Sequence, residues 1–395
     1  MKRNQYIVLL ISLSLFIVSC KKESPAPVNP QPVDPTAKFT VVSSGGACSN
    51  TTITGSYMAG TVLDGSNKVI VQVNVTATGT YTAASSNLYG MKFSAAGSFT
   101  TTGSQTITLT GTGTPAFAGT ISIPFTAGYS TCSLTIFVSP PPIGTLLDND
   151  HMLMGNPSNG AMIIDSINNY LMRKPYYTIS YSRDRGTPNW VSWHLYNQDL
   201  GSTPRQDDFR PDYTLPPFWY EVPEYAYSSS GFDRGHNCPS GDRTNTVEAN
   251  SSTFFMTNMI PQAPTLNQQT WGHFEDSLRR LVNAGFELYI IMGTYGTGGT
   301  GNNGFATTID GGQVAVPASI WKIAVVIPNG NNDISRVDAS IRLIAVDMPN
   351  TNSVNNNWKN YRVSVDAIEA ATGYDLLSVL PAPVQAILEA RVDNL

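Results

Sequence analysis

Three short segments in the second half of the chain contain residue types that suit chemistry on a phosphate diester. The first segment reads Asp233-Arg234-Gly235-His236 and is followed closely by Cys238. Alternate side chains of an extended strand point to the same face, so Arg234, His236 and Cys238 are expected to share one face. Such a face places a proton acceptor beside a fixed positive charge, which is useful next to a phosphate.

The second segment, Thr257 to Gln262, is followed by a third that predicts an amphipathic helix from Leu266 to a C-cap near Gly285. The apolar face of this helix consists of residues at helical spacing, namely Leu266, Phe274, Leu278, Leu281 and Val282. Asn267, Trp271 and Glu275 recur every four residues and form a neighbouring stripe.

Asn267 and Glu275 are candidates for a metal site on this stripe. At the helical rise they stand about 12 Å apart along the axis, so both cannot bind one ion directly. One direct amide ligand, with a carboxylate that acts through water, is the arrangement that fits. A single neutral oxygen ligand with several waters is typical of Mg²⁺, which loses its water reluctantly.

In order and spacing, these segments resemble the DNA/RNA non-specific endonucleases, a family of ββα-metal (His-Me finger) nucleases. The resemblance runs from about Asn149 to the C-terminus and includes a closing segment from Ala367 to Pro381. Its motifs are residues 233–236, 257–262 and 266–268, together with Trp271 and Glu275. Four ordered motifs make this resemblance specific, whereas an isolated Asp-Arg-Gly-His would be a weak match.

The resemblance implies a catalytic role or a metal-binding role for three of these residues. His236 is expected to be the general base that deprotonates the attacking water. Asn267 is expected to be the sole protein ligand of Mg²⁺, with Mn²⁺ as a candidate substitute. Glu275 is expected to hold the ion through water.

The resemblance also implies which residues bind the substrates, DNA and RNA. Arg234 is expected to contact the phosphate, and a second arginine to stabilise the developing negative charge. Arg205 is the first choice for this second arginine, and Arg210 is the alternative because the loops before the signature vary in length. Asn258 is expected to support the site and to contact the substrate. None of these contacts reads a base edge, so sequence preference should be weak.

Other interpretations of single residues are less favoured. Cys238 and His236 could form a nucleophilic pair, but Asn267 and Glu275 would then have no function, so a buried thiol is preferred for Cys238. His194 and His273 are expected to be packing or surface residues. The glycine-rich run 293–304 lacks the ending of a phosphate-binding loop and is expected to be a flexible surface loop.

The strands and the helix expected around these residues predict an α+β domain over residues 145–395, with a mixed sheet. Aromatic strands are expected at 176–181 and 190–196, and another strand at 287–292. Residues 143–395 contain 16 basic and 25 acidic residues, which argues against binding of nucleic acid through bulk charge. A local basic groove is nevertheless expected, with modest affinity and strong salt sensitivity, from a group of ten residues: Arg173, Lys174, Arg183, Arg185, Arg205, Arg210, Arg234, Arg243, Arg279 and Arg280.

Residues 38–139 predict a separate all-β, immunoglobulin-like sandwich that serves as a spacer, with a carbohydrate- or surface-binding module as the alternative. Short alternating runs recur between glycine-bearing turns, at residues 69–76, 90–99, 105–109, 120–125 and 132–138. A disulfide between Cys48 and Cys132 is expected if the chain is exported. With charged residues at 13% of the whole chain, a coiled coil is excluded.

The first twenty residues predict a targeting signal. A basic start and a short apolar run lead to Ile17-Val18-Ser19-Cys20, which resembles the bacterial lipobox. A proline-rich linker over residues 21–37 would hold the domains away from a membrane. The chain is therefore expected to be exported and anchored through lipidated Cys20 to the outer membrane or cell surface, with no protein partner implied. Two other functions remain open: another His-Me finger phosphodiesterase, and an inactive surface adhesion lipoprotein.

Overall fold

The computed structural model describes residues 36–142, 144 and 146–395. The expected signal peptide with Cys20, and all but the last residues of the expected linker, lie outside this range. None of the helices in the described range has the length and apolar character needed to cross a membrane.

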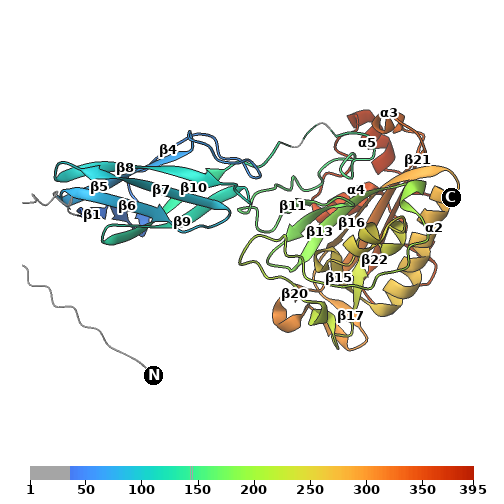
Figure 1. Ribbon diagram of the computed structural model, residues 1–395. Helices are drawn as coiled ribbons and strands as arrows, with labels where there is room; N and C mark the ends of the chain where they lie inside the picture. The colour runs from blue at the N-terminus through green and yellow to red at the C-terminus, as the bar shows by residue number, and fades with distance from the viewer. Residues whose placement is uncertain (1–35, 143, 145) are drawn as a thin grey trace, which may run out of the picture.

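The N-terminal domain is built from β-strands throughout residues 36–142, and Figure 1 shows the longer strands running along its length. The hydrogen-bonded order is β1-β5-β8-β7-β6-β9-β10-β3-β2, with β4 beside β5. The strands are β1 Lys38–Val41, β2 Ser43–Ser44, β3 Ala47–Cys48, β4 Thr52–Thr54, β5 Lys68–Ala77, β6 Gly79–Ser85, β7 Met91–Phe99, β8 Gly103–Gly113, β9 Gly119–Ala127 and β10 Ser130–Val138. The five expected strands are confirmed as β5, β7, β8, β9 and β10.

Alternation between core and solvent explains why these threonine-rich segments form strands. Ile121, Ile123 and Phe125 of β9 are buried, while the residues between them are exposed. The predicted disulfide between Cys48 and Cys132 is confirmed, and it links residues 84 positions apart. In the chain-entropy model a loop of this size stabilises the fold by about 4–5 kcal/mol. The immunoglobulin-like type of the domain stays a prediction.

The C-terminal domain has one large sheet in the order β11-β12-β13-β16-β21-β22. Its strands are β11 Tyr170–Arg173, β12 Thr178–Ser182, β13 Thr187–Leu195, β16 Phe286–Tyr295, β21 Ser319–Pro328 and β22 Arg342–Pro349. The expected strands at 176–181, 190–196 and 287–292 are confirmed as β12, β13 and β16. The expectation of a mixed sheet is wrong, because every neighbouring pair in this sheet is antiparallel.

The two faces of this sheet bury separate sets of side chains. Along β16, Ile290 and Met292 belong to one core, whereas Tyr289 and Ile291 belong to the other. The first core is covered by α2 (Gly272–Asn283), and the second by α4 (Val365–Thr372) and α5 (Ala382–Glu389) (Figure 1). β13 and β16 are neighbours in the middle of the sheet, so the chain between Leu195 and Phe286 leaves one central strand and returns to the next.

The glycine-rich run 293–304 is not the expected flexible surface loop. It completes β16 and then forms the hairpin of β17 (Gly299–Gly301) and β18 (Gly304–Ala306). A Cβ at Gly301 would lie 2.3 Å from the carbonyl oxygen of Gly231, and one at Gly299 would lie 2.7 Å from the side chain of Asn350. The glycines are therefore required by close backbone packing.

The remaining elements are short. They are β14 Asp233–His236, α1 Val247–Ser252, β15 Met259–Gln262, β19 Thr308–Ile309, β20 Val314–Ala315 and α3 Asp333–Arg336. The two domains touch near the start of the C-terminal domain. There, Ile164 packs against the β-domain core, and the Thr120 amide donates to the Asp165 carboxylate over 2.7 Å.

Candidate active site

The hairpin of β14 and β15 carries the Asp-Arg-Gly-His segment. The two strands pair antiparallel, with Asp233 opposite Gln262 and His236 opposite Met259. A Cβ at Gly235 would lie 2.3 Å from Oε1 and 2.6 Å from Cβ of Gln262 on the neighbouring strand. Position 235, between Arg234 and His236, therefore requires glycine. The hairpin and the helix that follows it form the expected ββα unit.

Asn258 fixes the end of this hairpin. Its buried side chain accepts a hydrogen bond from the Cys238 amide (3.0 Å) and donates to the carbonyl oxygens of Cys238 (2.9 Å) and Thr253 (2.8 Å). These bonds use both the oxygen and the NH₂ group of the Asn258 amide, and the side chain is buried. The expected support of the site fits this arrangement, but the expected substrate contact is wrong because the side chain is inaccessible.

A second buried asparagine, which the sequence did not single out, ties the helix entrance to the far end of the sheet. Asn350 follows β22, and its side chain accepts from the Ala263 amide over 2.8 Å. The same side chain donates to the carbonyl oxygens of Pro261 and Pro317, both over 2.9 Å. The turn between β15 and the helix is thus held by a residue almost ninety positions further along the chain.

The predicted helix is continuous but begins with a π-helical segment, Leu266–Trp271, before α2. Its apolar face is confirmed, and Gly285 follows its end with a φ of +94°. Glu275 follows Asn267 by eight positions, whereas two turns of a regular α-helix contain about 7.2 residues. In such a helix the two side chains would therefore not lie directly above one another. The wider π turn absorbs this surplus, so Asn267 and Glu275 come onto one face. Trp271 instead points into the core.

Five predicted residues line a single pocket of about 230 Å³: Arg205, Arg234, His236, Asn267 and Glu275. Pro239, Ser240, Gly241 and Arg279 complete its wall. Arg205, Arg234 and Asn267 also border an adjoining hollow of about 370 Å³. The sequence prediction therefore identified residues that the fold does bring together.

His236 lies between aromatic rings and has an unpartnered nitrogen. The ring centres of Phe254 and Phe209 are 5.0 and 5.6 Å from that of the imidazole. Its Nε2 is buried and has no hydrogen-bond partner among the described residues. Burial lowers the pKa of His236 from its ordinary value of 6.5 to about 3, and the charges of Arg205 and Arg234 add to this effect. A hydrogen bond to the Arg234 backbone opposes the change. The imidazole is thus neutral near pH 7 and able to accept a proton.

Arg205 and Arg234 both line the pocket with this imidazole but have different electrostatic settings. Arg205 pairs with Asp207 over 2.6 Å, donates to the Ser240 hydroxyl over 2.8 Å and lies 4.8 Å above the Phe254 ring. Arg234 lies 4.1 Å above the Phe209 ring and forms no ion pair within residues 36–142, 144 and 146–395. Its positive charge is therefore available to a phosphate.

Arg210, the alternative to Arg205, lies outside the pocket. Its guanidinium pairs with Asp208 over 2.7 Å and donates to the Ser251 carbonyl oxygen over 3.0 Å. It also lies 4.1 Å above the Phe255 ring and is not among the residues that line the pocket of His236. The placement of the two side chains favours Arg205.

Asp233 orients the amide of Asn267. Nδ2 of Asn267 donates to Oδ2 of Asp233 over 2.9 Å, and Gln268 donates to the same oxygen over 2.9 Å. Because an ionised carboxylate only accepts hydrogen bonds, the NH₂ group of Asn267 must face Asp233. The amide oxygen of Asn267 is then left for the pocket, which suits a hard cation such as Mg²⁺.

Glu275 is held by a lysine that the sequence analysis missed. Nζ of Lys322 lies 2.9 Å from Oε1 of Glu275, and its side chain is fully buried. The same ammonium group stands 4.7 Å above the Trp271 ring and 5.3 Å above the Trp193 ring. Lys322 is the sole charge in the apolar strand β21. A lone charge in such a strand requires a buried partner, which is the signal that could have revealed it.

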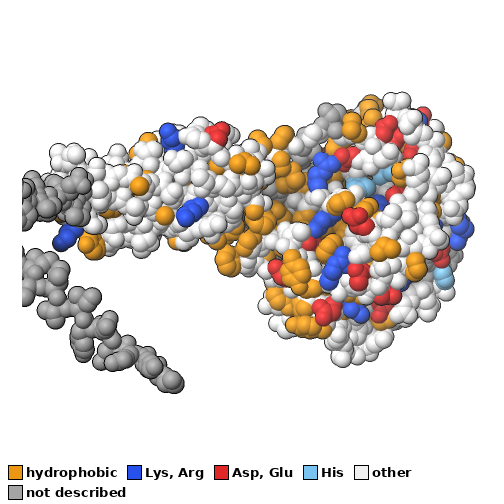
Figure 2. Space-filling model, viewed as in Figure 1, with side chains coloured by type: hydrophobic (Ala, Val, Ile, Leu, Met, Phe, Trp, Pro, Cys, Tyr) orange, Lys and Arg blue, Asp and Glu red, His pale blue; other side chains and the backbone are white. Residues whose placement is uncertain are grey.

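The expected basic groove is largely neutralised within the protein. Seven of its ten members pair with carboxylates: Arg173, Lys174, Arg183, Arg205, Arg210, Arg243 and Arg279. Figure 2 shows blue and red side chains mixed over the visible face of this domain, whereas the N-terminal domain displays few charges. Arg234 is the pocket arginine that keeps an uncompensated charge.

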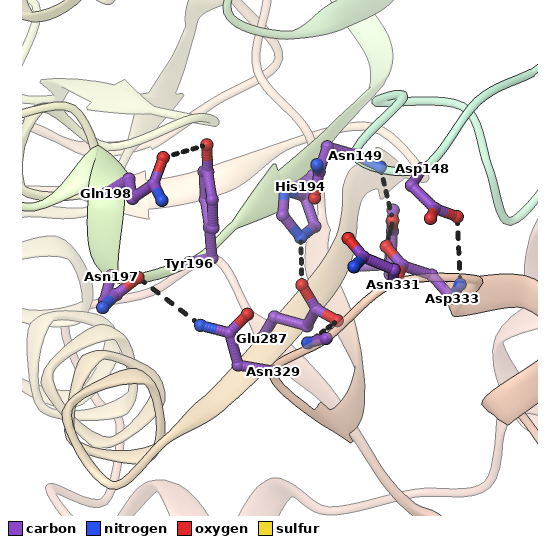
Figure 3. Close-up of polar contacts among 12 residues, drawn as sticks. Asp148, Asn149, His194, Tyr196, Asn197, Gln198, Glu287, Asn329, Asn331 and Asp333 are labelled. Carbon is purple, nitrogen blue, oxygen red and sulfur yellow. Dashed lines mark hydrogen bonds and ion pairs between the residues drawn. The ribbon is translucent and has the colours of Figure 1, made fainter.

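The remaining candidates lie away from the pocket. Cys238 is a buried free thiol whose pKa is raised by burial, so the nucleophile hypothesis is wrong. His273 is exposed on α2. His194 is buried in a polar network shown in Figure 3, with Nε2 3.2 Å from Oε2 of Glu287. Both histidines therefore have the packing and surface positions expected of them.

Comparisons with known proteins show what the chain is similar to. The sequence pattern of the DNA/RNA non-specific endonucleases matches residues 159–382, more than half of the chain. A nuclease of Nostoc sp. is 47% identical over 244 residues, covering 62% of this chain and 86% of that protein. Nuclease C1 of Cunninghamella echinulata var. echinulata is 29% identical over 216 residues, covering 53% of this chain and 84% of that protein. The chain also matches a solved structure of the EndoG/EndoGI complex, with a TM-score of 0.48 and 23% identity over 59% of this chain and 92% of that chain.

Proposed function

The chain belongs to the DNA/RNA non-specific endonuclease family and is a hydrolase, and from this premise we propose that it cleaves DNA and RNA with His236 as the general base and Mg²⁺ as the metal ion. The observation that carries the proposal is the neutral imidazole of His236, whose Nε2 lacks a partner among the described residues and which lines a pocket together with three arginines and Asn267. An unpartnered buried nitrogen is costly unless a ligand or substrate uses it.

In the proposed reaction, Nε2 of His236 removes a proton from the water that attacks phosphorus. The depressed pKa of His236 keeps this nitrogen unprotonated at neutral pH. Arg234, which has no carboxylate partner among the described residues, binds a non-bridging oxygen of the phosphate. Arg205, fixed by Asp207 and Ser240, stabilises the negative charge that develops as the bond to the attacking oxygen forms.

The residues present fit a magnesium ion. Asn267 offers an amide oxygen whose orientation is set by Asp233, and Glu275 offers a carboxylate that Lys322 holds in place. Asn267 is proposed as the direct ligand and Glu275 as a ligand through water, with Mn²⁺ as a candidate substitute. When bound, the ion supplies Lewis-acid stabilisation of the charge on the phosphate and on the departing oxygen.

The experiment that tests this function uses plasmid DNA and a long RNA. The purified protein with Mg²⁺ is expected to nick and then fragment both polymers, and a chelator is expected to stop cleavage. An inactive adhesion protein would leave both polymers intact. A phosphodiesterase for small substrates would cleave mononucleotide diesters in preference to the polymers, so a parallel assay with such a diester separates these outcomes.

We further propose that the protein is exported and anchored through a lipid on Cys20. The lipobox-like segment motivates this proposal, and the Cys48–Cys132 disulfide supports it because disulfides persist outside the reducing cytosol. The wild-type protein is expected in the membrane fraction with a mature N-terminus at modified Cys20, as mass spectrometry would show. Cys20→Ala is expected to release the protein or to leave its signal uncleaved. An unmodified, soluble wild-type protein would refute the anchor.

A further inference from the structure

Carboxylates gather where α4 meets α5, in the layer that covers the sheet face opposite the candidate active site. Asp366 and Glu369 belong to α4, and Glu389 is the last residue of α5. One carboxylate oxygen from each of these three residues lies within 4.8 Å of the other two. Asp375, shortly after α4, adds a fourth negative charge that acts on the group.

Glu389 is the buried member of this group, and one of its oxygens is unsatisfied. The residue is only 9% exposed, and its Oε1 has no hydrogen-bond partner among the described residues. Within the described chain, none of the four acids forms an ion pair with a lysine or arginine. Burial, followed by the charges of Glu369, Asp366 and Asp375, raises the pKa of Glu389 to about 7. The cluster therefore holds negative charge that no protein cation compensates.

The buried network around His194 shows what a compensated cluster looks like in the same domain. His194, Glu287 and Asp333 also bring ligand atoms within 4.8 Å of one another. There, however, Arg336 pairs with both carboxylates. His194 binds the second oxygen of Glu287 (Figure 3). Tyr289 donates to the remaining oxygen of Asp333. That cluster has its own cation and no unused oxygen, so it needs no metal ion.

We propose that Asp366, Glu369 and Glu389 bind a Ca²⁺ ion that fastens α5 to α4. All three ligand atoms are carboxylate oxygens, the donors that Ca²⁺ prefers. The three oxygens lie within 4.8 Å of one another, close enough for one ion to contact all of them. Ca²⁺ accepts flexible coordination by six to eight oxygens, whereas Mg²⁺ demands a near-regular octahedron, so a group of carboxylates from two separate helices suits calcium better. The exposed side of Asp366 leaves room for water to complete the coordination.

Thermal unfolding of the full-length protein tests this proposal. After treatment with a chelator, addition of Ca²⁺ at about 1 mM, in the range of extracellular calcium sites, is expected to raise the midpoint of unfolding. Glu389→Gln is expected to weaken calcium binding at least tenfold by calorimetry and to remove the calcium-dependent rise. The same variant is expected to unfold no earlier than the wild type in chelator, because the neutral amide removes a buried charge.

Three controls separate this site from the candidate active site. Glu248→Gln changes an exposed acid on α1 and is expected to keep the full calcium response. Asn267→Ala removes the proposed magnesium ligand and is also expected to keep it, so the failure of the proposed nuclease mechanism would leave this test unaffected. Glu389→Gln is expected to cleave DNA with Mg²⁺ as fast as the wild type does.

Two results would overturn the proposal. The first is a wild-type midpoint that does not change with Ca²⁺. The second is an equal calcium response in Glu389→Gln and Glu248→Gln. If Glu389→Gln does not fold, Asp366→Asn replaces it, since Asp366 is exposed and its substitution changes only the cluster; an undiminished calcium response in this variant would likewise overturn the proposal.

Discussion

His236, which lines a pocket, and His194, which is buried in a polar network, have opposite surroundings. His236 has a nitrogen without a partner in the part of the chain that the structure describes, and it lies near two arginines. His194 binds Glu287, which also pairs with Arg336. At Glu287, burial favours the neutral form, but the hydrogen bonds from His194 and Arg336 outweigh this effect and hold its pKa below the usual range. The comparison teaches that an unpartnered polar group marks a place for substrate, whereas a fully partnered group stabilises the fold.

The sharpest test of this contrast is His236→Ala. Loss of the general base is expected to lower kcat on plasmid DNA by about 10²–10⁴-fold. The free energy of unfolding should fall by only about 1 kcal/mol, because the removed ring had an unsatisfied nitrogen. Initial cleavage rates and chemical unfolding on the same preparation provide both numbers. Activity close to that of the wild type would remove His236 from the mechanism.

His194→Ala is expected to show the reverse pattern. The substitution leaves the buried Glu287 carboxylate with one partner fewer, so the free energy of unfolding should fall by about 3 kcal/mol. Specific activity of the folded fraction should stay within a factor of about two, since surface and core changes away from the chemistry act mainly on stability. A stable variant without activity would show that the two histidine sites are not separate in function.

Asp233→Asn tests whether the pocket depends on the orientation of Asn267. An amide at position 233 can donate as well as accept, so it no longer fixes which end of the Asn267 amide faces the metal. The Mg²⁺ concentration for half-maximal activity is expected to rise about 10–100-fold. Gln268→Ala, which removes the other donor to Asp233, is the matched control and should change this concentration far less. An unchanged requirement for Mg²⁺ in Asp233→Asn would contradict the orienting role.

The smallest expected effect concerns pH. Because the pKa of His236 is lowered to about 3, kcat/KM should change by less than about threefold between pH 8 and pH 5. A fall centred near pH 6.5, measured in a buffer series of constant ionic strength, would show that the imidazole titrates normally.

The same depressed pKa has a consequence for stability. In the unfolded chain His236 takes up its proton near pH 6.5, whereas in the folded chain it does so near pH 3. The unfolded state therefore binds more protons in this interval, and the free energy of unfolding should decline as pH falls from 6.5 towards 3. His236→Ala should show a shallower decline in urea unfolding over this interval.

Residues that act through local motifs could be predicted from the sequence, and residues that act through distant contacts could not. Arg234, His236, Asn267 and Glu275 were identified because their spacing within two short segments carries the chemistry. Lys322 was missed because its partner is 47 positions away, on the helix that packs against the sheet. Asn258 was given a substrate contact because burial is not visible in a motif. Strand positions followed from alternation, but the antiparallel arrangement of the sheet depends on long-range pairing that alternation does not encode.

The contacts between the β14–β15 hairpin, its helix and the later strands join parts of the pocket that lie far apart in the sequence. During synthesis, Glu275 is added to the chain well before Lys322 and Asn350. Lys322 holds Glu275 on the helix, and Asn350 holds the turn between β15 and the helix. A nascent chain that ends before β22 has His236 and Asn267 but lacks the Asn350 bonds at the helix entrance. The helix that carries Asn267 and Glu275 therefore lacks these anchoring contacts until β21 and the residue after β22 have been synthesised.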